Sequence, residues 1–166
     1  MPIVIKHTNL NEGIHHYQFD ESASSLGLED PFYGDISVEC ALDKSNHQIV
    51  LDVSVISDTE FDCDRCGENF KAEIESEFEL IYFFDEESGS NGDDNTFYLP
   101  PEQDKIDITE SIVENVLISI PMKKLCDDEC KGLCVKCGCN LNENTCECNK
   151  DNINPAWEKL LKLKDK

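Results

Sequence analysis

Four closely spaced cysteine pairs constrain the fold of this chain more than any other feature of its sequence. Two are Cys-x-x-Cys turns followed by glycine, one is Cys-x-x-x-Cys and one is Cys-x-Cys. In that order they are Cys63/Cys66, Cys134/Cys137, Cys126/Cys130 and Cys146/Cys148. Thiolates at these spacings can reach one ion, and glycine can take the positive φ that points backbone N–H groups at sulfur. The pattern predicts eight thiolate ligands in two tetrahedral metal sites.

The four pairs can be divided between two sites in more than one way. In the compact division, the distal site takes the pairs closest in sequence, Cys134, Cys137, Cys146 and Cys148. The other site then takes the remaining pairs, Cys63, Cys66, Cys126 and Cys130. This second site would pin the β-rich region to the segment that follows the helix. An interleaved arrangement, with Cys126 or Cys130 in the distal site, stays open.

Two of the ten cysteines fall outside these pairs. Cys40 lies in an alternating strand pattern and is predicted to be a buried thiol. Cys139 follows Gly138 directly and is predicted to be a spare thiol. The four histidines lie far along the chain from the late cysteine cluster and are predicted to be surface or hairpin residues.

The compartment decides how the cysteines are interpreted. No window approaches the roughly 20 apolar residues of a membrane span, and the N-terminus lacks the long apolar run of a secretory signal. We therefore expect a cytoplasmic protein, whose thiols stay reduced and available for metal. Zinc suits four thiolates best, and iron or an iron–sulfur cluster is the weaker alternative.

The predicted sites favour structural metal over catalysis. A catalytic zinc keeps an open coordination position, whereas four thiolates close each site. A redox Cys-x-x-Cys needs a thioredoxin-like setting that neither turn has. The sequence also lacks a P-loop, a dinucleotide fingerprint and a serine elbow. We expect a protein that is not an enzyme.

The charge is unevenly distributed along the chain. The formal net charge is −22, with 28 acidic and 5 basic residues in positions 1–122 and a near balance of 8 and 9 in positions 123–166. An acidic body repels phosphate backbones at long range. The charge therefore favours a basic protein partner over bare nucleic acid, while acidity that serves solubility alone stays open.

The first half of the chain is predicted to be β-rich. Three segments alternate or carry strong strand formers: Asp35–Leu42, Ile49–Ile56 and Phe70–Phe84. Asp43–His47 is predicted to be a hairpin loop. The segments Ile3–Lys6 and Ile14–Phe19 could add edge strands. The acidic segment Asp85–Thr96, rich in Gly, Ser and Asn, is predicted to be a loop.

The second half changes to a helical pattern. Apolar residues recur every four positions, at Ile108, Ile112, Val116 and Ile120. Asp107 is predicted to be the N-cap, and Pro121 should end the helix. A second helix is predicted from Asn154, with Pro155 at its first position and an apolar stripe of Trp157, Leu160 and Leu161.

Together these patterns predict an α+β fold in two parts. Residues 1–122 would form an acidic body, an antiparallel β meander that could be barrel-like, together with one central helix. Residues 123–166 would form a zinc-ribbon-like cysteine-rich segment followed by the C-terminal helix. In the compact division, the zinc ion at Cys63, Cys66, Cys126 and Cys130 would join the parts, and the second ion would lie within the later part.

The chain resembles a known family in several quoted motifs. These are the turn Cys63–Gly67, the helix ending in Ile120-Pro121, the run Cys130–Asn142, the pair Cys146/Cys148 and the ending from Asn154 to Lys164. They are similar to the YceD-like family of bacteria and plastids, whose members are called large ribosomal RNA subunit accumulation proteins. The likeness covers about Asp35 to the C-terminus. It implies the same eight cysteines, with Cys40 and Cys139 outside the pattern.

The resemblance also implies a role. The family is linked to accumulation or processing of large-subunit ribosomal RNA, without known catalytic activity, and its genes often neighbour one for a small large-subunit ribosomal protein. We therefore expect a zinc-stapled adaptor that binds a basic ribosomal protein or a large-subunit assembly intermediate. Small-molecule substrates and membranes are not expected.

Three other functions stay open from the sequence. Direct binding of ribosomal RNA could use Arg65 and the late lysines, Lys123, Lys124, Lys131, Lys136, Lys159, Lys162, Lys164 and Lys166. A metal-dependent nuclease would need carboxylates that converge on an open metal position. A metal-responsive regulator would lose zinc reversibly at physiological concentrations.

Overall fold

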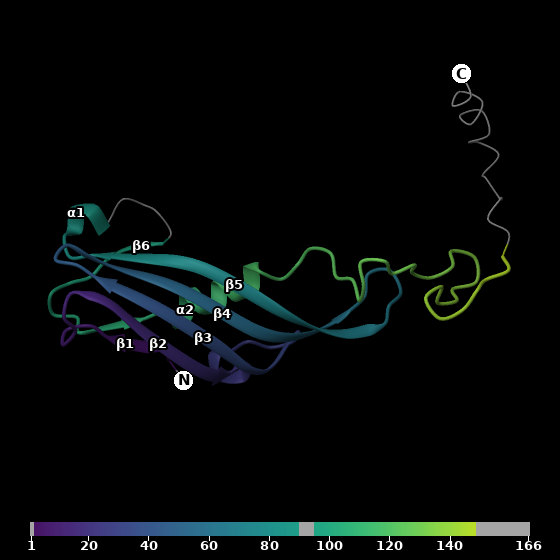
Figure 1. Cartoon of the computed structure of the whole chain (residues 1–166), viewed down its shortest axis with the longest axis horizontal. Coiled ribbons are helices and arrows are strands. Elements are labelled where there is room, and N and C mark those ends of the chain that lie inside the picture. The colour runs from purple at the N-terminus through teal and green to yellow at the C-terminus, as the bar shows by residue number, and fades with distance from the viewer. Residues whose placement is uncertain (1, 90–94, 149–166) are drawn as a thin grey trace, which may run out of the picture.

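Long alternating segments build one five-stranded sheet. The computed structural model describes residues 2–89 and 95–148. Within them the strand order is β2-β3-β4-β5-β6 (Figure 1). The strands are β2 (Gly13–Ser22), β3 (Phe32–Lys44), β4 (Gln48–Asp62), β5 (Asn69–Phe83) and β6 (Thr96–Tyr98). Strands β2 to β5 form the predicted antiparallel meander.

The alternation assigns one face of the sheet to the core. On β3 the side chains of Ile36, Val38 and Cys40 are buried, while Glu39 between them is exposed. Because successive side chains in a strand point to opposite faces, the same pattern continues through the paired residues of β4 and β5. The predicted buried thiol at Cys40 is confirmed, with 2% of the residue exposed.

A second layer covers the apolar face. Helix α2 (Thr109–Ile118) buries Ile112 and Val116 in the same apolar cluster as the sheet. A two-stranded ribbon of β1 (Val4–Lys6) and β7 (Lys105–Asp107) adds Ile5 and Ile106 to this cluster. The layered arrangement of an antiparallel sheet with one covered face explains the α+β class.

The structure corrects several details of the prediction. The sheet is open among the described residues, because β2 and β6 form its two edges, so the barrel is not confirmed. The early segment at β1 pairs with β7 instead of the main sheet. Sequence patterns missed β7 and β6, which are three residues long, and β6 runs parallel to β5.

The segment predicted as a loop and the helix cap also differ. The predicted loop contains a short helix, α1 (Glu86–Gly89), and Thr96 already begins β6. A short 3-10 helix, η1 (Ala23–Leu26), follows β2. The N-cap of α2 is Ile108 instead of Asp107, although Asp107 Oδ1 still accepts a hydrogen bond from the Thr109 backbone N–H at 3.0 Å.

The late part of the chain is tested only in part. Within the described residues of the cysteine-rich segment, backbone pairing is a single isolated antiparallel bridge between Leu133 and Asn140, so a zinc ribbon is not confirmed. The predicted C-terminal helix from Asn154 lies outside the described residues. The division of the chain at residue 122 stays a prediction.

The packing of α2 predicts the effect of a core truncation. Ile112→Ala removes a fully buried side chain and should lower the free energy of unfolding by about 3 kcal/mol. Leu117→Ala on the same helix is the matched control, because Leu117 is 48% exposed and its loss should cost under about 1 kcal/mol. Urea unfolding of both variants measures the difference, and equal losses would contradict the placement of α2.

Candidate metal centres

The first Cys-x-x-Cys turn lies at the tip of the longest hairpin. Strands β4 and β5 pair as far as Asp62 and Asn69, and the turn follows directly. The backbone N–H of Cys63 donates to Glu68 O at 2.9 Å, and that of Gly67 donates to Cys63 O at 2.8 Å. Gly67 has φ 72°, as the sequence predicts. The strands therefore carry both thiols to the far end of the sheet.

The second Cys-x-x-Cys turn repeats the first. The backbone N–H of Cys134 donates to Cys139 O at 2.9 Å, and that of Gly138 donates to Cys134 O at 2.8 Å. Gly138 has φ 73°. The same residues at the same spacing thus give the same turn, although only the first closes a hairpin of long strands. Both turns present two sulfurs on one side.

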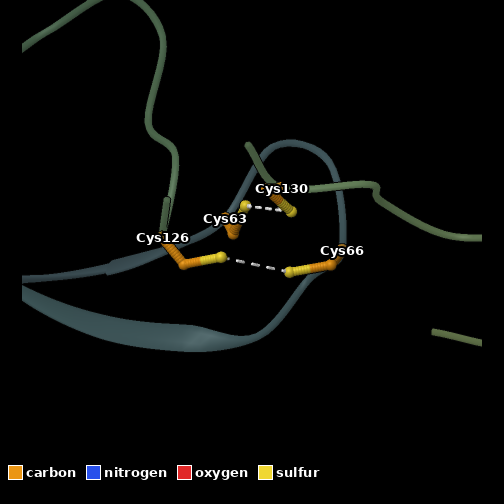
Figure 2. A group of neighbouring side chains, drawn as sticks. All are labelled: Cys63, Cys66, Cys126 and Cys130. Atoms are coloured by element: carbon orange, nitrogen blue, oxygen red, sulfur yellow. Dashed lines mark hydrogen bonds between the residues drawn. The ribbon is translucent and has the colours of Figure 1, made fainter. Parts of the chain in front are cut away.

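Four sulfurs meet at the hairpin tip. The Sγ atoms of Cys63, Cys66, Cys126 and Cys130, which we call the proximal group, all lie within 4.8 Å of one another (Figure 2). The Sγ atoms of Cys63 and Cys130 are 3.8 Å apart, and those of Cys66 and Cys126 are 3.6 Å apart. Zinc with four sulfurs at about 2.3 Å has sulfur–sulfur edges of about 3.8 Å. The spacing fits one tetrahedral ion.

The proximal group is largely shielded from solvent. Cys63, Cys66 and Cys130 are buried, whereas Cys126 is exposed. Phe70 and Leu125 pack against the buried members. This second apolar cluster is separate from the main core and is too small to hold the late segment by apolar burial alone.

Hydrogen bonds attach the late segment to the tip. The backbone N–H of Asp64 donates to Lys124 O at 2.8 Å, and the Lys124 N–H donates back to Asp64 Oδ2 at 2.7 Å. Arg65 Nη1 donates to Cys130 O at 2.8 Å, and the Leu133 N–H donates to Arg65 O at 3.1 Å. These bonds bring residues about sixty positions apart in sequence into a fixed register.

The surroundings favour thiolate at Cys63 of the first Cys-x-x-Cys turn and at both cysteines of the second, where a backbone hydrogen bond from Cys139 is the largest cause that lowers the pKa of Cys137. A backbone hydrogen bond from Cys126 is the largest cause that lowers the pKa of Cys63 to about 6. For Cys134, the backbone N–H of Cys137 is the largest cause of a pKa of about 6. Burial raises the pKa of Cys40 to about 11, so this thiol stays protonated.

A side-chain donor also reaches the proximal group. Asn142 Nδ2 donates to Cys130 Sγ at 3.2 Å, and this bond is the largest cause that lowers the pKa of Cys130. Asn142 in turn accepts from the Lys131 backbone N–H at 2.7 Å through Oδ1. Such bonds to ligand sulfur orient it and favour the charged form that binds metal.

The second group of sulfurs differs from the predicted set in one member. Cys134, Cys137, Cys139 and Cys146, which we call the distal group, lie with their Sγ atoms within 4.8 Å of one another. Cys139 therefore joins this group, and its spacing of two residues from Cys137 is the signal that could have indicated it. Cys148 lies beside the group, with its backbone N–H donating to Cys146 Sγ at 3.3 Å.

The donor chemistry of both groups fits a soft or borderline metal. Each offers four thiols, and among residues 2–89 and 95–148 the two groups that could hold an ion contain cysteine only. Thiolate donors in tetrahedral arrangement suit zinc or iron. Which cysteines bind the metal, and which share an ion, stays a prediction.

The sheet and the two cysteine groups define an α+β protein with two candidate metal centres. Comparison with protein families matches residues 51–164 to the family described as "Large ribosomal RNA subunit accumulation protein YceD". Because this match covers more than half of the chain, the chain belongs to that family. The family is described by its role in the accumulation of large-subunit ribosomal RNA.

Curated relatives come from plants and a bacterium. The chain is 29% identical over 129 residues to "Large ribosomal RNA subunit accumulation protein YCED homolog 1, chloroplastic" of Arabidopsis thaliana, covering 62% of this chain and 40% of the relative. The Zea mays protein of the same name is 34% identical over 61 residues, covering 36% and 21%. An uncharacterized protein of Mycobacterium leprae is 36% identical over 58 residues, covering 35% and 26%.

Two further findings complete the comparisons. The matched part of this chain spans less than half the length of each of these relatives, and no solved structure matches. The helices of the described residues include none with the length and apolar character that crossing a membrane requires.

The approach of Gly132 to the hairpin tip gives a test of the docking. Gly132 has φ +73°, and a Cβ there would lie 2.9 Å from Arg65 O. Gly27 has φ +78° with open space around it. We expect Gly27→Ala to cost about 1 kcal/mol from backbone strain alone. Gly132→Ala should cost more and weaken metal binding, as measured by thermal unfolding and metal titration. Equal effects would contradict the close approach.

The thiol pKa values predict metal release on acidification. Protons compete with metal for thiolate sulfur. The pKa of Cys63 and of Cys134 is lowered from 9.0 to about 6. The stabilisation that these thiolates give is therefore fully present above about pH 9 and is lost as the pH falls through about 6. Bound metal, measured after gel filtration at each pH, should fall mainly below about pH 6. Metal fully retained at about pH 4 would contradict this.

Proposed function

We propose that the chain is a zinc-stabilised, non-catalytic factor that supports accumulation of large-subunit ribosomal RNA by binding a basic ribosomal protein or a large-subunit assembly intermediate. Eight thiolates in two sets would hold two zinc ions, one at each cysteine group. The ions would supply the cross-links that a small apolar cluster cannot. The proposal includes a cytoplasmic location, because thiols that bind zinc must stay reduced.

The observation that carries the proposed partner is the sheet face that no other described element covers, which we call the uncovered face. The layer of α2 and the β1–β7 ribbon packs on the other face, with the apolar cluster. Exposed carboxylates of β2 to β5 point to the uncovered face: Asp20, Glu39, Asp52, Asp58, Glu73, Glu75, Glu77 and Glu79. Lys71 lies at one end of this face, and its Nζ atom is 4.6 Å from the centroid of the Tyr33 ring.

Some of these carboxylates are direct cross-strand neighbours. Asp52 pairs with Glu79, and Asp58 pairs with Glu73. Like charges placed opposite each other destabilise a sheet. A partner that brings lysine or arginine side chains would remove this repulsion, so a basic polypeptide is favoured by the fold itself as well as by net charge.

The face is also hollowed at its centre. A hollow of 810 Å³ is lined by His16, Gln18, Glu39, Asp52 and Glu77, among others. Ile56, at 39% exposure, lies opposite Glu75 on the same face and adds apolar surface. Carboxylates around a recess with some apolar area suit an extended basic segment better than an RNA phosphate backbone, which the charge repels.

Two alternative functions are supported by fewer observations. Direct RNA binding would use the late lysines and Arg65, but Arg65 Nη1 already donates to carbonyls of the late segment. A nuclease would need carboxylates at an open metal position, whereas both metal-binding groups among the described residues consist of thiols. The proposed factor therefore acts without catalysis.

A charge reversal on the sheet face tests the proposal. In the variant D52K/E77K/E79K, the paired positions of Asp52 and Glu79 still carry charges of the same sign as each other. The fold should therefore be retained while the face becomes basic. We expect the affinity for basic proteins extracted from the large ribosomal subunit to fall about tenfold or more, equivalent to about 1.4 kcal/mol. Binding is measured with the purified, zinc-loaded chain at several salt concentrations.

The matched control reverses three exposed acids away from this face, E12K/E29K/E102K, with the same change in net charge. It should bind nearly as well as the wild type. An equal loss in the control would show that only net charge matters. Tight binding of ribosomal RNA by the wild type, with a steep salt dependence, would replace the adaptor with an RNA-binding factor.

A further inference from the structure

Strand β5 leaves most of one backbone edge unpaired. On one side it pairs with β4 along its whole length, from Asn69 to Phe83. On the other side β6 reaches only Ile81 to Phe83, so among the described residues no strand lies beside residues 71–79 (Figure 1). We call this stretch the open edge. An unpaired edge of this length is a template on which another strand can pair.

Hydrogen bonds show which backbone groups of β5 point to the open edge. The Ile81 N–H donates to Asn95 O at 2.9 Å, on the side of β6. Ala72 O instead accepts from Thr59 Oγ1 of β4 at 2.8 Å. The N–H and C=O of one residue point to the same side of an antiparallel strand, and the side alternates along the chain. The outward residues of the open edge are therefore the odd-numbered ones: Lys71, Glu73, Glu75, Glu77 and Glu79.

The side chains of the outward residues make the open edge acidic. Those of Glu73, Glu75, Glu77 and Glu79 are exposed and belong to the uncovered face. In a strand added beside β5, every second side chain would lie alongside one of these carboxylates, at the spacing of cross-strand neighbours. Lysine or arginine at alternate positions would therefore form a row of ion pairs along the edge.

The other side of the open edge borders a groove. It has a volume of 900 Å³ between β5, β6 and α2, and its lining includes Glu79, Phe97, Glu110, Glu114 and Ile118. Ile118 is 80% exposed. The remaining side chains of an added strand would turn to the α2 side, where apolar ones can cover Ile118. The groove and the carboxylates together favour one pattern, in which basic and apolar residues alternate.

We propose that the open edge takes up an extended basic segment of the protein partner as an added strand. The inference rests on the proposed function and states how the basic partner binds. Backbone hydrogen bonds to β5 give the attachment, and alternate basic side chains give the selectivity. An RNA strand has no row of peptide N–H and C=O groups to pair with this edge. A second copy of the chain would set glutamates against glutamates, which like-charge repulsion disfavours.

Amide hydrogen exchange of the full chain tests the proposal residue by residue. The probe is a synthetic peptide of alternating lysine and valine, as long as the open edge. In the free chain the outward amides of Glu73, Glu75 and Glu77 should exchange fast. The inward amides of Ile74 and Ser76, on the side of β4, should exchange slowly. Saturating peptide should slow the outward amides about tenfold or more and leave the inward amides nearly unchanged.

A proline substitution removes one outward donor. Glu75→Pro deletes an N–H that points away from β4, where edge strands tolerate proline, so the fold should be retained. Glu75→Gln loses the same charge but keeps the N–H, and it is the matched control. The peptide affinity of Glu75→Pro should be about tenfold below that of Glu75→Gln, because a strand hydrogen bond is lost. Isothermal titration calorimetry measures both affinities, and thermal unfolding checks both folds.

Four results would overturn the added strand. The first is a peptide that fails to bind or that leaves the outward amides unprotected. The second is equal affinity of Glu75→Pro and Glu75→Gln. The third is equal protection by a peptide of the same composition whose lysines stand in one block, because net charge alone would then explain binding. The fourth is slow exchange of the outward amides in the free chain, which would show an edge already paired, with a second copy if the protection depends on concentration.

The same two variants separate this inference from the proposed function. Both are also tested with basic proteins extracted from the large ribosomal subunit. Stronger binding by Glu75→Gln than by Glu75→Pro would support the added strand. Equal binding by the two variants would overturn the strand and keep the proposed function. A wild-type chain that binds none of these proteins would overturn both, and protection of the outward amides by ribosomal RNA would assign the edge to RNA instead.

Discussion

The attachment of the late segment to the tip of the β4–β5 hairpin is the contact on which the rest of the structure depends. It joins Cys63 and Cys66 to Cys126 and Cys130 through sulfur spacing that fits one ion. A reciprocal pair of hydrogen bonds between Asp64 and Lys124 fixes the register. The apolar cluster there is small, so little else opposes the entropy of ordering this segment. A metal cross-link would supply what the core cannot.

The two faces of the sheet have different roles. One face buries the alternating apolar side chains under α2 and the β1–β7 ribbon, and this provides the stability of the body. The other face carries closely spaced carboxylates, including directly paired ones, and a central hollow. Such pairing costs stability, so a basic partner gives a physical reason for its presence. The family role in ribosomal RNA accumulation is compatible with a ribosomal protein as that partner.

The two cysteine groups are built from the same turn but stand in different surroundings. At the hairpin tip the turn is shielded by Phe70 and Leu125, and Asn142 donates to Cys130 sulfur. At Cys134 the same turn lies in a segment with a single isolated bridge and belongs to a group of four thiols. The same local turn therefore stands in two different surroundings, because three cysteines of the proximal group are buried and those of the distal group are half-buried or exposed.

The sequence by itself determined the local structure. Period-two alternation fixed β3, β4 and β5, and the glycines after each Cys-x-x-Cys gave the positive φ of both turns, since these depend on neighbouring residues. Only the tertiary structure decided which distant thiols meet, that β1 pairs with β7, that the sheet stays open, and that Cys139 joins the distal group. These outcomes depend on how separate segments pack in space, and short strands or turns carry too few residues to encode that packing locally.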